Sequence, residues 1–216
     1  TNAIKSLVPF LMLPILTTHL TVSDFGLLSL IEVTILLLTP LISLNIYGAI
    51  KVEYVSLNKH LLREYVVNAF ILSIISFLIV VTVFMCFSQT LSESLKIQES
   101  LIVFLPFFAL LRISTQVVSG LFQMAEQPIH YALFVSCQTV LDFTLSYILV
   151  VIYDGGYIGR LEGVYIAFFI FTIISISILC KMGLLAKPTF KFTKRILQFG
   201  TPLIPHAMAG TIMAMS

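Results

Sequence analysis

The sequence predicts an all-α polytopic membrane protein, and three observations carry this prediction. Hydrophobic residues make up 59% of the 216 residues and charged residues only 10%, whereas a soluble domain is about one quarter charged. Mean hydropathy is +1.08. The apolar residues are gathered into segments of roughly the 20 residues that one bilayer crossing requires. A single soluble core of this size cannot bury so much apolar surface, so we expect lipid to surround the chain.

Six complete apolar segments and the start of a seventh follow one another along the chain. Their expected bounds are 4–20, 25–50, 65–87, 101–123, 128–153 and 164–182, with the seventh opening at Ile196. Prolines interrupt several of them, and each proline removes a backbone donor and crowds the preceding turn. We therefore expect Pro9 and Pro14 to kink or break the first helix, and Pro40 to kink the second.

Polar stretches between these segments are expected to be loops. Residues 51–64 carry lysines, an arginine and a histidine, and residues 88–100 are mildly acidic. The stretch 154–163 is glycine-rich, and a tight turn is the favoured interpretation. Its Gly155, Gly159 and Gly163 spacing also allows a second interpretation, in which they continue into the sixth segment as a close-packing helix face. No strand precedes these glycines, which argues against a nucleotide-binding loop.

Polar residues recur at helical spacing inside three of the apolar segments. They are Ser29, Glu32, Thr39 and Ser43 in the second segment, Arg112, Gln116, Ser119 and Gln123 in the fourth, and Gln138, Asp142 and Ser146 in the fifth. Steps of three and four residues place side chains on one face of a helix. We expect the stripes of the fourth and fifth segments to face one another or to line one cavity.

Arg112 and Asp142 are predicted to lie at similar depth in the membrane. The turn at Glu126 comes 14 residues after Arg112 and 16 residues before Asp142, which at about 1.5 Å per residue places both roughly 21–24 Å from the turn. A charge at mid-membrane costs about 3 kcal/mol on insertion scales. One interpretation is a salt bridge between the two that locks two helices together. The other is that Arg112 binds an anionic lipid headgroup, because a guanidinium forks onto phosphate oxygens.

Three further residues are candidates for function. Asp142 is a candidate ligand for a coupling cation or proton. Glu32 is expected to line the outer half of a cavity or to relay protons, or else to bond a neighbouring serine or arginine. His206 lies in the seventh segment, which Pro202 and Pro205 are expected to kink.

The sequence argues against a membrane enzyme with a metal or nucleophilic centre. It contains no HExxH pattern, no nucleophile elbow and no loop long enough to hold a soluble substrate. Cys86, Cys137 and Cys180 lie inside apolar segments without CxxC pairing, and we predict them to be small core residues. No cofactor, metal or nucleic acid is expected.

The cations predict the orientation of the chain. With the N-terminus inside, nine lie in cytoplasmic segments: Lys5, Lys51, Lys59, Arg63, Lys181, Lys187, Lys191, Lys194 and Arg195. Only Lys96 and Arg160 lie in segments expected outside. Cytoplasmic loops of membrane proteins carry such an excess of Lys and Arg, so we expect a cytoplasmic N-terminus.

Four stretches of the chain resemble the polysaccharide-exporting flippases, of the O-antigen flippase (Wzx-type) group in the multidrug/oligosaccharidyl-lipid/polysaccharide superfamily. These stretches are 11–30, 120–128, 155–163 and 199–205. They are spread over the whole chain, and their order and spacing carry the resemblance more than any one of them does.

The resemblance implies two bundles of six helices that rock between inward-open and outward-open states. The substrate would be a polyprenyl-pyrophosphate-linked oligosaccharide, moved to the outer leaflet of the bacterial cytoplasmic membrane, with H⁺ or Na⁺ as the coupling cation. Residues 1–195 would form the first bundle and residues 196–216 the start of the second. The paired prolines early in the first and seventh segments fit such a repeat. Because the chain lacks an initial Met and stops within an apolar segment, we expect a piece of a longer protein.

Two other functions remain open at this stage. A cation-coupled drug or metabolite exporter of the same superfamily would favour an acidic, aromatic cavity, which Arg112 argues against. A multi-span polysaccharide polymerase is the other. A purely structural membrane protein would not need Glu32, Arg112 and Asp142 at depth.

Overall fold

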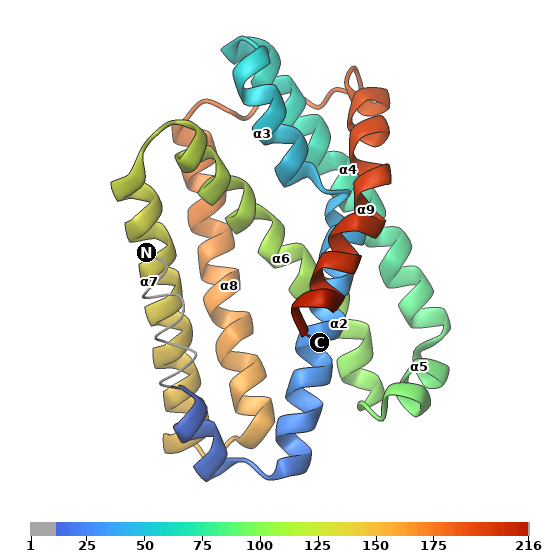
Figure 1. Ribbon diagram of the computed structural model, residues 1–216, viewed down its shortest axis with the longest axis vertical. Coiled ribbons are helices and arrows are strands. Elements are labelled where there is room, and N and C mark those ends of the chain that lie inside the picture. Colours follow the sequence, from blue (N-terminus) through green and yellow to red (C-terminus); the bar gives the residue numbers. More distant parts are fainter. Residues whose placement is uncertain (1–11, 216) are drawn as a thin grey trace.

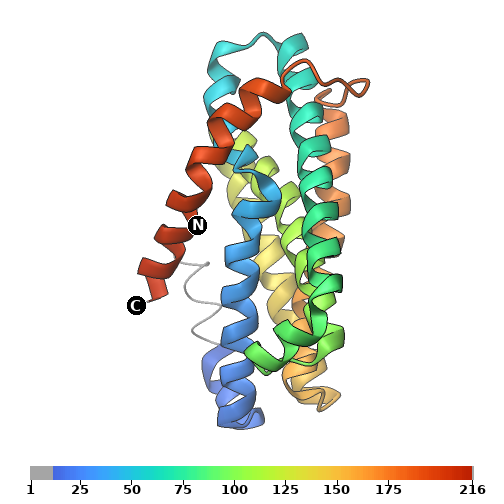
Figure 2. The ribbon, with the colours of Figure 1, turned by 90° about the vertical axis from the view of Figure 1, so that its right-hand side faces the viewer.

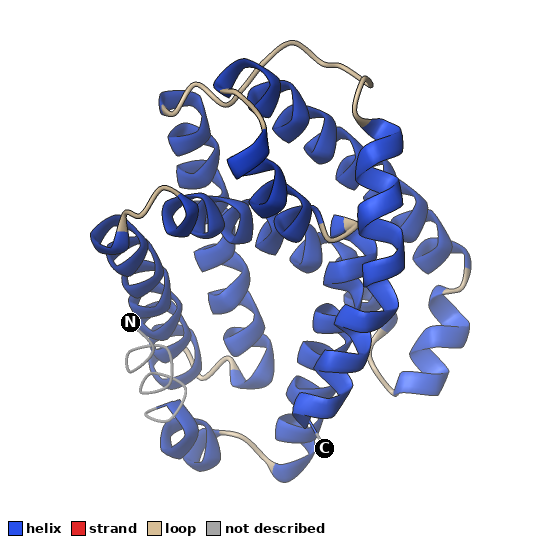
Figure 3. Cartoon of the chain, turned by 45° about the horizontal axis from the view of Figure 1, so that its top comes forward, coloured by secondary structure: helices blue, strands red, loops and turns tan. Residues whose placement is uncertain are grey.

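The long apolar segments become long helices, and no strand forms among residues 12–215, which the computed structural model describes (Figures 1 and 3). The elements are α2 (Val22–Ser43), α3 (Ile46–Ser56), α4 (Lys59–Cys86), α5 (Ser88–Leu95), α6 (Glu99–Met124), α7 (Pro128–Tyr147), a π-helical turn η1 (Ile148–Ile152), α8 (Gly156–Lys181) and α9 (Thr193–Met215). Residues 12–19 are also helical, whereas Pro9 and the rest of the predicted first segment lie outside the described residues.

Five helices within residues 12–215 are long and apolar enough to cross a membrane. They are α2, α4, α6, α7 together with η1, and α8. The chain is therefore an all-helical, multi-pass membrane protein. In α6, 56% of the most apolar stretch is buried, against 33% or less in the other four. α6 packs against α2, α3, α4, α7 and α8, so it is the central helix of the bundle. Figure 2 shows α9 running beside α2 and diverging from it toward the C-terminal end.

Two of the predicted loops are wrong, because they are mostly helical. Within 51–64, α3 continues to Ser56 and α4 begins at Lys59. The Asn58 side chain caps α4 by accepting a hydrogen bond from the Leu61 N–H (3.0 Å). Within 88–100, α5 occupies most of the stretch. The polarity of these residues marks where the chain leaves the apolar phase, and a well-capped helix continues past that boundary.

The boundary between α2 and α3 is a sharp break at Leu44 and Asn45, four residues beyond the predicted kink at Pro40. Both residues adopt left-handed backbone conformations, with φ of 49° and 51°. Two serines of α4 satisfy carbonyls that the break leaves without helical partners. Ser73 donates to the Ser43 carbonyl (3.3 Å) and Ser76 to the Leu41 carbonyl (2.9 Å). The polar residues of α4 therefore hold the end of α2 in place.

The predicted tight turn at 154–163 is wrong as well, since α8 already begins at Gly156. The second interpretation, a close-packing glycine face, is confirmed. A Cβ added to Gly163 would lie 2.8 Å from the backbone of Ser146, and one added to Gly159 would lie 2.8 Å from the Leu149 carbonyl oxygen. The absence of side chains here lets α7 and α8 approach closely, which matters for the charged groups they carry.

Replacing Gly163 with alanine should lower the stability of the protein in detergent by about 1–3 kcal/mol, because the new methyl group must displace the α7 backbone. Gly26→Ala is the matched control, since a Cβ at Gly26 meets no atom within 4 Å. We expect a lower melting temperature for Gly163→Ala and an unchanged or higher one for the control. Equal melting temperatures for the two variants would contradict the close packing of α7 and α8.

The prediction that the three cysteines belong to the core is wrong. Cys86, Cys137 and Cys180 are all exposed at the surface of the bundle, as free thiols. In lipid, outward-facing positions are as apolar as the core, so an apolar neighbourhood in the sequence does not distinguish the two.

A polar cavity inside the helix bundle

The polar stripes of α6 and α7 line one cavity, of about 260 Å³. It is closed on a third side by α8. Its lining residues are Arg112, Thr115, Gln116 and Ser119 from α6, Val135, Gln138, Thr139 and Asp142 from α7, and Phe168 from α8. The two polar stripes thus line one cavity, and four of the candidate site residues are among its lining residues: Arg112, Gln116, Gln138 and Asp142.

Arg112 lies at the middle of α6, with 13 helical residues before it and 12 after it. Its guanidinium carbon lies 5.1 Å from the centre of the Phe168 ring, a distance typical of a cation–π contact. Within the part of the chain that the structure describes, no carboxylate lies within ion-pair distance of this guanidinium. The predicted salt bridge between Arg112 and Asp142 is therefore wrong.

Asp142 is paired with Arg160 instead. Arg160 Nη1 donates to Asp142 Oδ1 (2.6 Å) and also makes a very short contact with Ser146 Oγ. The Ser146 hydroxyl donates to the same carboxylate oxygen (3.2 Å). Both charged side chains are mostly buried, with 14% of Arg160 and 22% of Asp142 exposed. This ion pair connects α7 to α8 and neutralises one carboxylate of the cavity.

Sequence reasoning missed Arg160 because it placed this residue in an outward loop. Arg160 is the fifth residue of α8, and the close approach of α7 and α8 at their glycines brings it to Asp142. The sequence feature that could have identified Arg160 is the four-residue spacing of the glycines, interpreted as a close-packing helix face. If Gly155, Gly159 and Gly163 lie on a helix, then Arg160 is helical too and points toward the same neighbourhood.

The electrostatic surroundings of Arg112 include charges that do not touch it. Glu32 of α2, Asp142 and Arg160 all lie close enough to interact with its charge. The Glu32 side chain is exposed at the surface of the described chain and lines neither this cavity nor the next. His206 of α9 is also exposed and does not line either cavity. Two of the six candidate residues thus lie outside the cavity.

The hydroxyl groups of the cavity are oriented by their own helices. Thr115 donates to the Arg112 carbonyl (2.8 Å), Ser119 to the Gln116 carbonyl (2.9 Å) and Thr139 to the Val135 carbonyl (2.8 Å). Their hydrogens are therefore used, and their oxygens remain available as acceptors. Gln116 and Gln138 add amide donors and acceptors. The cavity therefore combines one cation that is unpaired among the described residues, one ion-paired carboxylate and neutral groups that hydrogen-bond to hydroxyls.

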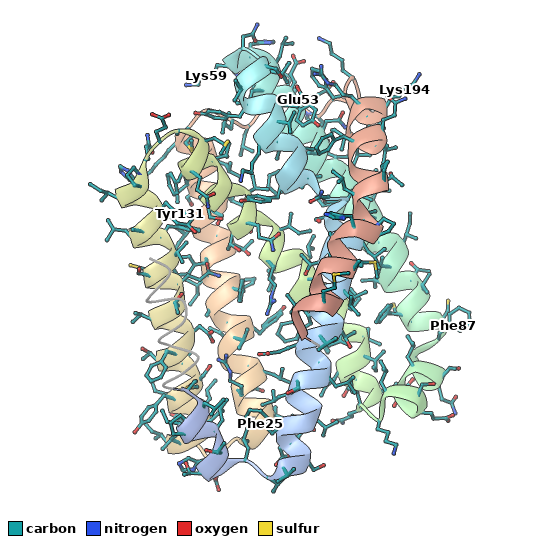
Figure 4. All side chains as sticks on the ribbon, viewed as in Figure 1. Phe25, Glu53, Lys59, Phe87, Tyr131 and Lys194 are labelled. Atoms are coloured by element: carbon teal, nitrogen blue, oxygen red, sulfur yellow. The ribbon has the colours of Figure 1, made fainter. Side chains whose placement is uncertain are left out.

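A second, larger cavity of about 500 Å³ shares two lining residues with the first. It lies among α2, α3, α6, α7 and α9. Its lining residues are Leu36, Thr39, Pro40, Ser43, Asn45, Tyr47, Gln116, Ser119, Gln123, Tyr131 and Ala207. Gln116 and Ser119 line both cavities. The polar stripe of α6 thus runs from Arg112, at the middle of the helix, toward the α6–α7 turn at one end of the bundle. Figure 4 labels Tyr131 near that turn.

That end of the bundle is also the cationic end. It holds α3, the start of α4, the end of α8 and the start of α9, where Lys59 and Lys194 are labelled in Figure 4. Phe25 and Phe87, labelled at the opposite end, lie next to the outward segments predicted from the sequence. Eight of the nine cations predicted to be cytoplasmic lie in these segments or in the α8–α9 connection (Figure 1), whereas Lys96, Arg112 and Arg160 lie elsewhere and Lys5 lies outside the described residues.

An ion pair between a buried carboxylate and an exposed arginine attaches α9 to the rest of the bundle at the cationic end. Arg195 Nε lies 2.7 Å from Glu53 Oε1, and Glu53 is only 5% exposed. Asn68 of α4 accepts a hydrogen bond from the Phe192 N–H (2.9 Å), just before α9 begins. Glu53 was not identified from the sequence, because residues 51–64 were predicted to be a polar loop. These contacts place α9 along one side of the second cavity.

Comparisons with known proteins complete the description of the chain. A sequence model of the family described as polysaccharide biosynthesis protein matches residues 1–216. Searches of the curated proteins and of the solved structures gave no match. The matched range includes every residue of both cavities. Within residues 12–215, no group of three His, Cys, Asp or Glu side chains is arranged to hold a metal ion.

Proposed function

The chain belongs to the polysaccharide biosynthesis protein family, as its resemblance to the exporting flippases predicted, and from this premise we propose that it carries a polyprenyl-pyrophosphate-linked oligosaccharide across the bacterial cytoplasmic membrane. One observation carries the proposal. Arg112 is a cation at the middle of a membrane-crossing helix, faces a cavity, and has no carboxylate partner among the described residues. An arginine in that position is expensive to insert, so its unpaired state indicates an anionic ligand.

The chemistry of the cavity suits both parts of such a substrate. The guanidinium presents N–H donors in a plane, which bind two phosphate oxygens at once. Phe168 contacts that guanidinium, and stacking on a ring face leaves the N–H edge free to bind. The neighbouring amides of Gln116 and Gln138 and the acceptor oxygens of Thr115 and Thr139 match sugar hydroxyls.

The two cavities, which share Gln116 and Ser119, would supply a route between Arg112 and the cationic end. In our proposal that end is cytoplasmic, which fits the distribution of cations, and the N-terminus is cytoplasmic as well. Six helices of this chain would form one bundle, and α9 would begin the second. Alternating access would then expose the Arg112 cavity first to the cytoplasmic side and then to the outside.

The same geometry suggests which group would couple transport to H⁺ or Na⁺. Asp142 is neutralised by Arg160, so its carboxylate is engaged. Glu32 lies close enough to Arg112 to interact electrostatically and has no ion-pair partner within residues 12–215. We therefore assign the coupling ion to Glu32, which would be neutralised when the ion binds and would then no longer attract the charge of Arg112.

Deletion of the gene in the source cell tests the proposal. We expect surface polysaccharide to be lost while complete lipid-linked repeat units accumulate on the cytoplasmic leaflet, as measured by their access to a membrane-impermeant glycosidase. Normal surface polysaccharide together with increased retention of cationic dyes would instead support a cation-coupled exporter. Loss of polymer with repeat units already on the outer leaflet would support a polymerase.

A further inference from the structure

A third cavity, remote from Arg112, lies at the cationic end of the bundle. Its volume is about 460 Å³, within the size range of ligand pockets. It is formed where the α3–α4 corner meets the end of α8. Most of its wall is apolar, and two polar side chains complete it. The lining residues are Tyr54, Leu57, Lys59, Leu62, Met182 and Leu184.

Two cations beside this cavity have no acidic partner. Lys59 lines the cavity, and Arg63 lies one helical turn further along α4. Within residues 12–215, neither has a carboxylate within ion-pair distance, whereas Lys191 at the same end is 3.8 Å from Glu64 and Arg195 is 2.7 Å from Glu53. Acidic groups are therefore present at this end of the bundle, but they form ion pairs with other cations.

Arg63, beside the cavity, carries a hydrogen-bond donor that no acceptor within residues 12–215 satisfies. Its Nη2 donates to the Leu185 carbonyl (3.0 Å), next to the Leu184 wall of the cavity. Its Nε is buried and has no hydrogen-bond partner. A buried N–H without a partner is destabilising. Positive charge and an unused donor on the same segment both favour a bound anion.

The apolar wall limits which anion fits. A free phosphate would leave the half-exposed Leu57 and Met182 in contact with water, whereas an amphipathic molecule covers them with its chain. The cavity lies at the start of α4 and the end of α8, two of the membrane-crossing helices, where lipid headgroups are expected, and in our proposed orientation this end is cytoplasmic. Basic pockets between membrane helices on the cytoplasmic side are suited to anionic lipid headgroups.

We propose that this cavity binds an anionic phospholipid of the cytoplasmic leaflet, with its phosphate on Lys59 and Tyr54 and the start of an acyl chain against the leucines. The positive end of the α4 helix dipole lies at the same place and adds to the attraction. The lipid would fasten the α3–α4 corner to the end of α8. This site is separate from the Arg112 cavity and does not depend on the transported substrate.

The test compares lipids on the purified full protein in detergent. Phosphatidylglycerol should raise the melting temperature by several degrees more than phosphatidylcholine at the same mole fraction. Lys59→Gln should weaken phosphatidylglycerol binding by about tenfold and remove most of that difference, and Lys59→Arg should keep it. Lys194→Gln is the matched control, an exposed lysine at the same end, and should behave as the unmodified protein.

Three results would overturn the proposal. Equal effects of the two lipids would show that no anionic headgroup is selected. Equal losses in Lys59→Gln and Lys194→Gln would show a diffuse attraction of the cationic end rather than a site. An equal rise in melting temperature with inorganic phosphate alone would assign the cavity to a free anion. None of these results depends on transport, so the proposed function would stand or fall separately.

Discussion

Arg112→Ala should abolish transport and leave the protein folded. The substitution removes the only cation lining the described Arg112 cavity, together with its paired donors. Charge-assisted hydrogen bonds contribute about 1.5–3 kcal/mol each, so losing a forked pair should weaken binding of a pyrophosphate by about 100-fold or more. Folding should not suffer, because no carboxylate within residues 12–215 loses an ion-pair partner. Removing a mid-membrane charge favours insertion by about 3 kcal/mol.

The measurement is surface polysaccharide in a deletion strain complemented with each variant, alongside the amount of protein in the membrane. Arg112→Lys is the informative companion, since it keeps the charge but loses the planar fork. We expect Arg112→Ala to restore no polymer, Arg112→Lys to restore a part of it, and both proteins to reach the membrane in normal amounts. Full complementation by Arg112→Ala would remove the observation on which the proposed function rests.

A smaller effect is expected at Gln138, which lines the cavity opposite Arg112. Gln138→Ala removes one neutral hydrogen-bonding group, worth about 0.5–1.5 kcal/mol. The concentration of lipid-linked substrate needed for half-maximal transport in proteoliposomes should rise by about two- to tenfold, with the maximal rate retained. A loss of maximal rate with unchanged substrate dependence would argue against a role of Gln138 in binding.

The polar face of the site was predictable from the sequence because helical periodicity determines it. Once residues 101–123 are helical, the positions of Arg112, Gln116 and Ser119 relative to one another follow from 3.6 residues per turn. The same holds for Gln138 and Asp142. The existence of a shared cavity then follows from the short turn between the two helices, which places them side by side.

The partner of Asp142 was not predictable in the same way. Depth along the membrane placed Arg112 and Asp142 at the same level, but an ion pair also depends on how each helix is rotated and how closely it packs. The glycines at 155, 159 and 163 decide this by bringing α8 against α7. Glycine is typical both of turns and of close helix contacts, so composition alone could not select the right one.

The ends of the helices were mispredicted for a related reason. Hydropathy locates the boundary of the apolar phase, whereas helix ends depend on capping and on backbone breaks. Asn58 caps α4 well before its apolar stretch begins, and the break at Leu44 and Asn45 contains neither glycine nor proline. The serines of α4 that satisfy the broken end of α2 come from about 30 residues away in the sequence.

Substitutions in the ion pair between Asp142 and Arg160 should affect the stability of the protein and its transport activity differently. Asp142→Ala leaves the mostly buried Arg160 without a carboxylate and with only the Ser146 hydroxyl as a partner, and breaking a buried ion pair in this way costs about 3–5 kcal/mol. We expect a marked fall in melting temperature. Arg112 stays unpaired in this variant, so the molecules that fold should still transport.

Arg160→Ala should instead reduce transport more than it reduces stability. Asp142 and Arg112 line the same cavity, so a released Asp142 carboxylate has a second cation within reach. Re-pairing would offset part of the lost stability, and it would occupy the guanidinium that the substrate needs. We therefore expect a modest fall in melting temperature and a loss of transport of about tenfold or more.

The double variant Arg160→Ala with Asp142→Asn decides between the two roles of the ion pair. Asparagine keeps the shape of the side chain but carries no charge that could neutralise Arg112. If Arg160 acts by holding Asp142 away from Arg112, transport should recover in the double variant relative to Arg160→Ala alone, even where stability does not. If Arg160 only fastens α7 to α8, the double variant should transport no better than Arg160→Ala. Melting temperature and transport measured on the same three proteins distinguish a positioning role from a structural one.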